Sequence, residues 1–258
     1  MKVTFIGTAG SALTAELSYS SILINDDLLL DCGEGTTQKL IKLGYINNLK
    51  IICITHLHND HFIGLFSILW YYWIETQRKT PLKIIGPPKT EYTIRKILEL
   101  INTPKNVFNF KMIFRELKDT NEIQVAEKNT YKITAIKMEH QPINFGFRIE
   151  DISEKKAIFY TGDTKSNERI LKLSKNCELL ICECTFPDEL SEFAHKYNHC
   201  TPYDAAILGN KAEVKKLVLT HISSIFQNEE ELEKIKNQAK QQSKNEVIVA
   251  KDLLTLEI

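Results

Sequence analysis

The chain has 258 residues, of which 43% are hydrophobic and 26% charged, a composition that supports a packed interior and excludes general disorder. Lysine plus arginine and aspartate plus glutamate number 33 each, so the net charge is zero. A broadly basic nucleic-acid-binding surface is therefore excluded, and a polyanion must be held by a local patch or a bound cation.

Strand-like runs alternate with helical patterns along the chain. In the first half, strands are predicted at residues 2–6, 20–25, 27–31, 50–54 and 82–85, and helices at 35–43, 62–75 and up to about residue 101. Residues 108–138 predict consecutive strands with turns at 119–122 and 127–130. Beyond them we expect strands at 145–150, 157–160, 178–182, 216–220 and 247–250, a helix after residue 160, and helices at 202–211 and 229–242.

Meandering strands between flanks of alternating strand and helix predict an α/β protein with mixed sheets and helices outside. No low-complexity linker interrupts the pattern, so we expect one domain over residues 1–258. The N-terminal segment lacks the layout of a signal peptide, and no apolar run reaches the roughly 18 residues of a membrane span. With six scattered cysteines, these features predict a cytoplasmic protein without a membrane segment.

Three of the seven histidines lie within six residues, in I-T-H-L-H-N-D-H. His56, His58, Asp60 and His61 follow a predicted buried strand, at the sheet end where sites are usually built. Imidazole and carboxylate ligands suit Zn²⁺, Mn²⁺ or Fe²⁺. His56 and His58 can share one ion while Asp60 and His61 face a second, so this cluster predicts a metal site rather than a histidine-rich surface turn.

Three further candidates, His140, Asp163 and His221, each follow another predicted strand. L-V-L-T-H repeats the strand–Thr–His order of the first cluster, and Gly162 allows a sharp turn before Asp163. A carboxylate such as Asp163 can bridge two cations roughly 3.5–4 Å apart, the separation that clamps an in-line displacement. Together these residues supply the missing ligands of a two-metal site.

The sequence contains H-x-H-x-D-H, then a lone His, a G-D and a late T-H. This order of motifs resembles that of the metallo-β-lactamase superfamily, whose fold is an αββα sandwich. Within it, D-C-G-E-G-T-T-Q, E-C-T-F and H-C-T resemble the tRNase Z (ribonuclease Z) branch. The resemblance implies two zinc ions, one held by His56, His58 and His140 and the other by Asp60, His61 and His221, with Asp163 between them. It also implies a homodimer.

The same resemblance implies catalytic roles for Asp60, Glu183 and His199. Asp60 would orient or deprotonate the attacking water, and His199, polarised by Glu183, would protonate the departing oxygen. We therefore predict a two-metal hydrolase that cleaves phosphodiester bonds with metal-activated water. Its leading substrate is the 3′ end of precursor tRNA.

Three segments depart from the tRNase Z pattern. A flexible arm that grips tRNA usually separates the lone His from the bridging Asp, but His140 and Asp163 are only 23 positions apart. Where the branch has P-T-x-x-R-N and S-x-R-Y, this chain has L-T-A-E-L-S and S-S-I-F, without the arginines that contact phosphate. One alternative is therefore the same metal site acting on a small phosphodiester, sulfate ester or lactone. Another is a non-catalytic RNA- or protein-binding relic, although all seven ligands are retained.

Overall fold

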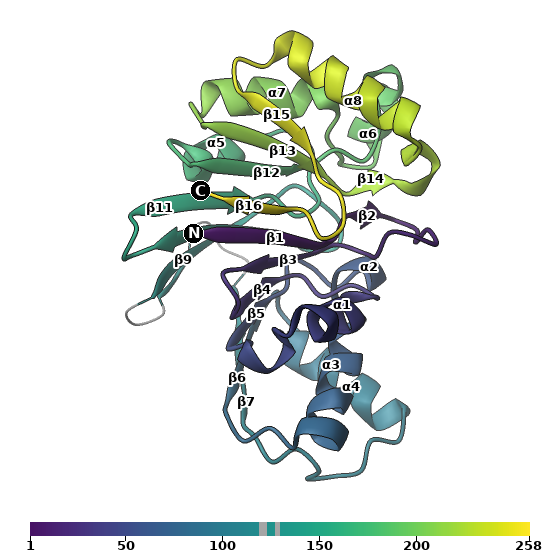
Figure 1. Ribbon diagram of the computed structural model, residues 1–258, viewed down its shortest axis with the longest axis vertical. Coiled ribbons are helices and arrows are strands. Elements are labelled where there is room, and N and C mark those ends of the chain that lie inside the picture. Colours follow the sequence, from purple (N-terminus) through teal and green to yellow (C-terminus); the bar gives the residue numbers. More distant parts are fainter. Residues whose placement is uncertain (119–122, 127–129) are drawn as a thin grey trace.

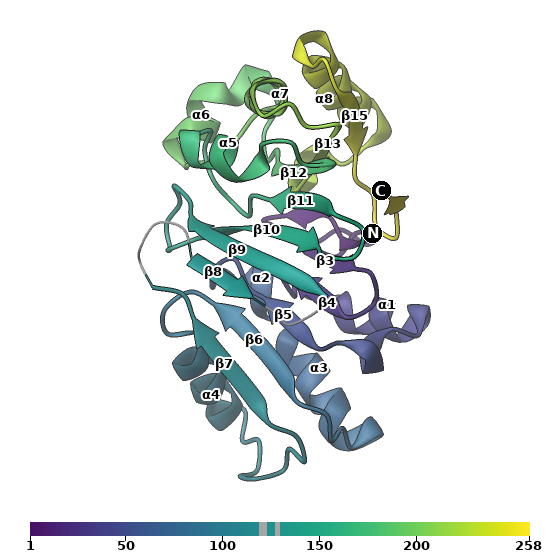
Figure 2. The ribbon, with the colours of Figure 1, turned by 90° about the vertical axis from the view of Figure 1, so that its left-hand side faces the viewer.

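A computed structural model describes residues 1–118, 123–126 and 130–258, so the predicted turn at 119–122 and most of the next lie outside the described residues. Within that part of the chain, two seven-stranded sheets pack face to face and helices cover both outer faces (Figures 1 and 2). This arrangement is the αββα sandwich that the sequence predicted.

The first sheet has the order β16-β1-β3-β4-β5-β6-β7. Its strands are β1 (Lys2–Gly7), β3 (Ser21–Ile24), β4 (Leu28–Leu30), β5 (Ile51–Cys53), β6 (Leu82–Gly86), β7 (Met112–Glu116) and β16 (Thr255–Glu257). Strands β4 to β7 run parallel. Helices α1 (Thr36–Leu43), α3 (Leu65–Tyr71) and α4 (Thr90–Leu100) contribute apolar side chains to the cluster on its outer face.

The second sheet has the order β15-β13-β12-β11-β10-β9-β8. Its strands are β8 (Ile123–Ala126), β9 (Tyr131–Lys137), β10 (Phe145–Asp151), β11 (Lys156–Tyr160), β12 (Leu179–Glu183), β13 (Lys216–Thr220) and β15 (Glu246–Val249). Strands β11, β12, β13 and β15 run parallel. Its outer face packs on α5 (Glu168–Ser174), α7 (Pro202–Lys211) and α8 (Glu229–Gln242).

Short elements complete the fold. Strands β2 (Ala9–Gly10) and β14 (Ile222–Ser223) pair in parallel, and α2 (Asn59–Phe62) and α6 (Ser191–Lys196) are single short helices. 3-10 turns lie at Ile46–Asn48, Asp188–Leu190 and Ser224–Phe226, and a π turn at Tyr72–Thr76 follows α3. Across the described ranges, each helix is too short or too polar to cross a bilayer.

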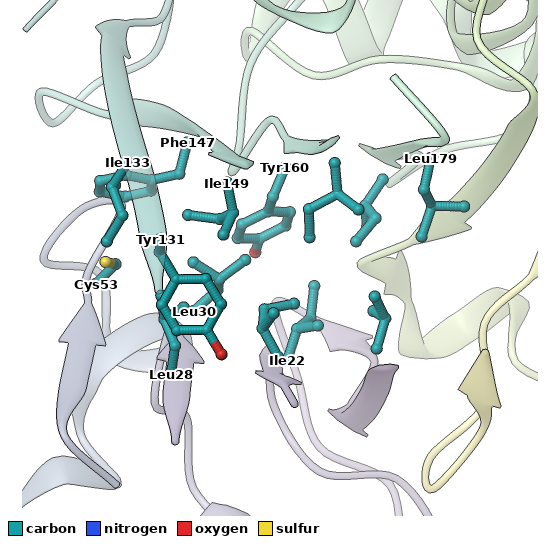
Figure 3. Close-up of a cluster of buried hydrophobic side chains, with 14 of the residues drawn as sticks. Ile22, Leu28, Leu30, Cys53, Tyr131, Ile133, Phe147, Ile149, Tyr160 and Leu179 are labelled. Carbon is teal, nitrogen blue, oxygen red and sulfur yellow. The ribbon is translucent and has the colours of Figure 1, made fainter. Parts of the chain in front are cut away.

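Apolar side chains fill the space between the sheets (Figure 3). Side chains alternate along a strand, so Phe147 and Ile149 of β10 enter this core while Arg148 points away from it. From the opposite sheet, Ile22 and Leu28 meet them, and all four of these apolar residues are at most 1% exposed. This shared core fixes the strand ends of one sheet relative to those of the other.

The helix predicted at 62–75 is interrupted. A Cβ atom at Gly64 would lie 2.0 Å from the carbonyl oxygen of Gly33, and the Gly64 N–H donates to the Cys32 carbonyl at 2.9 Å. This close contact between two backbones separates α2 from α3. As a result, α2 is a separate turn of helix that carries Asp60 and His61.

Candidate metal centre

The predicted site residues converge at one edge of the sandwich, beyond the carboxyl ends of parallel strands from both sheets. His56 follows β5, Asp60 and His61 lie in α2, His140 follows β9, Asp163 follows β11, Glu183 ends β12, His199 precedes α7, and His221 follows β13. Three overlapping groups of ligand atoms lie within 4.8 Å of one another: His56, His58, His140 and Asp163; Asp60, His61 and His221; and Asp163, His199 and His221. Eight of the nine predicted residues therefore belong to these groups, and the ninth, Glu183, joins them through His199, whose Nδ1 lies 2.9 Å from Glu183 Oε1.

The first group surrounds one oxygen of Asp163. The Nε2 atom of His56 lies 3.8 Å from Asp163 Oδ2, and that of His140 lies 4.0 Å from it. His58 completes the group, with its Nδ1 3.0 Å from His56 Nε2. Gly162 adopts a left-handed φ of 56° just before Asp163, which is the sharp turn that the sequence predicted.

The second group surrounds the other oxygen of Asp163. The Nε2 atoms of His61 and His221 lie 3.3 and 3.4 Å from Asp163 Oδ1 and 3.2 Å from each other. Asp60 Oδ2 lies 3.2 Å from His221 Nε2 and 3.6 Å from His61 Nε2. The two oxygens of Asp163 thus face two different sets of ligands, as a bridging carboxylate requires.

Several of these buried polar atoms have no hydrogen-bond partner within the described residues: both ring nitrogens of His140 and Oδ1 of Asp163. Leaving buried polar atoms unpaired costs free energy, which a bound cation would offset. Nitrogen and carboxylate donors in closed groups of this kind suit divalent transition metals. The side chains present therefore fit metal binding.

Asp31, which sequence reasoning did not single out, holds His61 in place. Its Oδ2 accepts a hydrogen bond from His61 Nδ1 at 2.7 Å and another from the Tyr160 hydroxyl at 2.9 Å. The backbone N–H of Thr55 donates to Oδ1 at 2.7 Å. An outer carboxylate of this kind fixes the ring and the tautomer of a histidine ligand. In the sequence, Asp31 stands out only as the first residue of D-C-G-E-G-T-T-Q, which is informative through its family resemblance alone.

Thr185 plays the same part for His221. Its hydroxyl lies 2.9 Å from His221 Nδ1 and donates to Glu183 Oε2 at 2.8 Å, so the imidazole N–H can donate to Thr185 while Nε2 faces the centre. His221 itself has a left-handed φ of 57°, and so does Asp31 at 56°. Non-glycine residues rarely adopt this conformation, and strained backbones of this kind cluster at functional sites.

Glu183 is fully buried and orients His199. Its Oε1 accepts hydrogen bonds from His199 Nδ1 and the Thr164 N–H, both at 2.9 Å. Burial lowers the pKa of His199, but the Glu183 carboxylate outweighs it and raises this pKa to about 9. The Glu183 contact therefore favours the protonated form of His199, and Nε2 is free of that contact.

The pKa directions of most of these side chains favour the protonation state that can bind a metal ion. Burial holds the pKa of His56 and His140 below the usual value, so both imidazoles are neutral. Burial raises the pKa of Asp163, but His221 and His61 more than reverse this, so it is well below the usual value. His61 is the exception: against the effect of burial, Asp163, Asp31 and Asp60 raise its pKa well above the usual value.

A sequence profile of the family described as "Anti-Pycsar protein Apyc1" matches residues 1–243. Ribonuclease Z of Methanosarcina acetivorans is 32% identical over an alignment of 316 positions that covers 100% of this chain and 98% of the relative. Ribonuclease Z of Archaeoglobus fulgidus is 29% identical, with coverages of 100% and 97%.

Two crystal structures share the fold over their whole length. The short form of human tRNase Z has a TM-score of 0.84 at 27% identity, covering 100% of this chain and 99% of that one. The metallo-β-lactamase fold protein YhfI from Bacillus subtilis has a TM-score of 0.82 at 24% identity, with coverages of 99% and 98%. The sandwich is therefore the metallo-β-lactamase fold.

Proposed function

The chain belongs to the ribonuclease Z family, as well as to the family described as anti-Pycsar protein Apyc1, and on this premise we propose that it cleaves the phosphodiester bond at the 3′ end of precursor tRNA. It is a metal-dependent hydrolase with the metallo-β-lactamase fold. The observation that carries the proposal is the division of the Asp163 oxygens between two groups of ligands. That division supports a pair of metal ions rather than one.

We assign one ion to His56, His58 and His140 and the other to Asp60, His61 and His221, with Asp163 shared. Zinc is the metal we expect, and the same donors accept Mn²⁺ or Fe²⁺. When bound, such a pair lowers the pKa of water to about 7 and neutralises the charge of a phosphodiester. A protein of zero net charge gains in this way a local means of holding an anion.

Asp60 positions the nucleophile. Its Oδ2 accepts a hydrogen bond from the backbone N–H of Ser11 at 3.1 Å and lies 3.2 Å from His221 Nε2. These contacts fix the carboxylate at the edge of the centre, where it orients the attacking water and accepts a proton from it.

His199 acts as the general acid. As the water oxygen adds to phosphorus, the bond from phosphorus to the leaving oxygen breaks, and His199 Nε2 gives that oxygen a proton. Glu183 holds the opposite ring nitrogen and stabilises the imidazolium. The His199 ring lies 5.3 Å from the ring of His140 and 6.0 Å from that of His221, close enough to serve a substrate bound at the centre.

A second candidate substrate, a small phosphodiester, is favoured by the short connection between His140 and Asp163. The ribonuclease Z alignment extends over 316 positions against 258 residues here, so the relative carries segments that this chain lacks. Ile225 is 69% exposed in the segment where the tRNase Z pattern has arginine. Both features reduce the surface that could grip tRNA.

Cleavage assays on two substrates separate the candidates. The metal-loaded protein is incubated with a precursor tRNA transcript carrying a 3′ trailer and with bis-p-nitrophenyl phosphate, and the Asp163→Ala variant serves as the control without a bridging ligand. Release of the trailer by the wild type supports tRNA processing. Turnover of the small ester with an intact transcript supports the second candidate, and turnover of neither rejects both.

We also propose that residues 1–258 act as one domain, and that the enzyme is a cytoplasmic homodimer, as its resemblance to tRNase Z implies. Sedimentation velocity at micromolar concentration tests the oligomer. A single species of 29.7 kDa at every concentration would reject the dimer.

A further inference from the structure

Three aromatic side chains, Phe186, Phe193 and Tyr197, form a contiguous aromatic row beside His199. The Phe186 ring centroid lies 5.9 Å from that of His199 and 5.1 Å from that of Phe193, and the Phe193 centroid lies 4.7 Å from that of Tyr197. Phe193 and Tyr197 are 47% and 51% exposed, so the row leads from the metal centre to the surface.

The row has a fixed position relative to His199. Phe193 lies in α6 and Tyr197 caps its C-terminus, with the Tyr197 N–H donating to the Phe193 carbonyl at 3.2 Å. The His199 N–H donates to the carbonyl of Ala194 at 2.8 Å, and the Ala194 side chain is fully buried in the same helix. Because this hydrogen bond ties His199 to α6, a ligand on the aromatic row is held at a constant distance from the His199 imidazole.

The chemistry of the row suits a nucleobase. Exposed rings offer faces on which any base can stack, and each stacked base contributes roughly 1–3 kcal/mol. Lys196 Nζ lies 5.7 Å from the centroid of Tyr197, which places a cation at the outer end of the row, where a substrate backbone would pass.

The position of His199 decides which base this is. The nucleoside that carries the leaving oxygen must approach the proton donor, and the aromatic row is the surface next to that donor. Resting on the proposed phosphodiesterase function, we propose that Phe186, Phe193 and Tyr197 bind the base of the nucleoside that carries the leaving oxygen.

The test uses a diuridine phosphodiester and two versions of it, each lacking one base. Product analysis identifies which nucleoside carries the leaving oxygen. For the wild type, we expect removal of that base to lower kcat/KM about 5- to 100-fold, mostly through KM. The double variant F193A/Y197A should lose the same factor on diuridine but less than twofold on the version that lacks the leaving-side base.

Two controls accompany the double variant. Tyr197→Phe keeps the ring and should retain wild-type discrimination, while Tyr92→Ala removes a 66% exposed tyrosine of α4 and should leave every rate unchanged. Equal losses by the double variant on diuridine and on the version without the leaving-side base would overturn the proposal. So would unchanged rates on all substrates.

The two proposals fail in different ways. If the wild type cleaves neither these esters nor the precursor tRNA transcript, the phosphodiesterase function is rejected, and calorimetric binding of diuridine to the metal-loaded protein then tests base binding by the aromatic row separately. Weaker binding of diuridine by F193A/Y197A than by the wild type supports base binding by the aromatic row, and equal binding rejects it. If the wild type hydrolyses the esters at the same rate whichever base is missing, only the proposal that the aromatic row binds a base is rejected.

Discussion

His61 donates a hydrogen bond from Nδ1 to Asp31 Oδ2 at 2.7 Å, and both side chains are fully buried. The contact joins the end of β4 to α2 and turns His61 Nε2 toward Asp163. Asp31 thereby positions a ligand without lying among the ligand groups itself.

We predict that Asp31→Asn lowers metal affinity by about 10- to 100-fold, because it removes the carboxylate that orients His61. Competition with a chromogenic zinc chelator measures the affinity. Asp27→Asn is the matched control, since Asp27 precedes β4 and also accepts a tyrosine hydroxyl, that of Tyr131, at 2.8 Å. Equal affinities for the two variants would show that the Asp31 contact is irrelevant to the metal.

The chemistry of the leaving group determines how strongly the hydrolysis rate depends on proton donation by His199. Because an alkoxide requires protonation and a nitrophenolate leaves as a stable anion, His199→Ala should lower kcat on diuridine by about 10²- to 10⁴-fold but spare bis-p-nitrophenyl phosphate. His195→Ala, which changes a 48% exposed imidazole paired with Asp204, should affect neither substrate. A uniform loss on both substrates would argue against proton donation by His199.

Removal of metal should destabilise the fold, because it leaves the buried nitrogens of His140 and an oxygen of Asp163 without partners. Thermal unfolding with EDTA and with added zinc measures the effect. At free zinc 100 times the Kd, one bound ion adds about 2.7 kcal/mol to the free energy of unfolding. An identical Tm under both conditions is the contrary result.

The core between the sheets should be sensitive to truncation. Ile149 is fully buried, so Ile149→Ala is expected to lower the free energy of unfolding by about 2–5 kcal/mol in urea titrations. Ile152→Ala, at a 51% exposed position in the turn after β10, should change it by less than about 0.5 kcal/mol. Similar losses at both positions would contradict the packing in Figure 3.

Elements with clear end signals were predicted correctly from the sequence. Helix α7 begins and ends where it was predicted, because Thr201 and Asp204 form a capping box and Pro202 opens the helix. Helix α6 was missed, since six residues give too little periodicity to recognise. The three-residue edge strand β16 was missed as well, because its place depends on pairing with distant β1.

The ligand residues were predicted for a different reason: metal-binding side chains stand out wherever strands end. Asp31 and Thr185 could not be recognised in that way, since aspartate and threonine are common in turns. Their contacts exist only after β4 and β12 have been placed beside the histidines. The aromatic row was hidden similarly, because it depends on the unpredicted helix α6.

The central claim is that two ions are held on either side of Asp163. Metal analysis of the purified protein by mass spectrometry, followed by zinc titration of the metal-free form, tests it most directly. We predict two ions per chain, with hydrolysis of bis-p-nitrophenyl phosphate appearing only as the second equivalent binds, and at most one ion in Asp163→Ala. Full activity with a single ion, or two ions retained by Asp163→Ala, would contradict the claim.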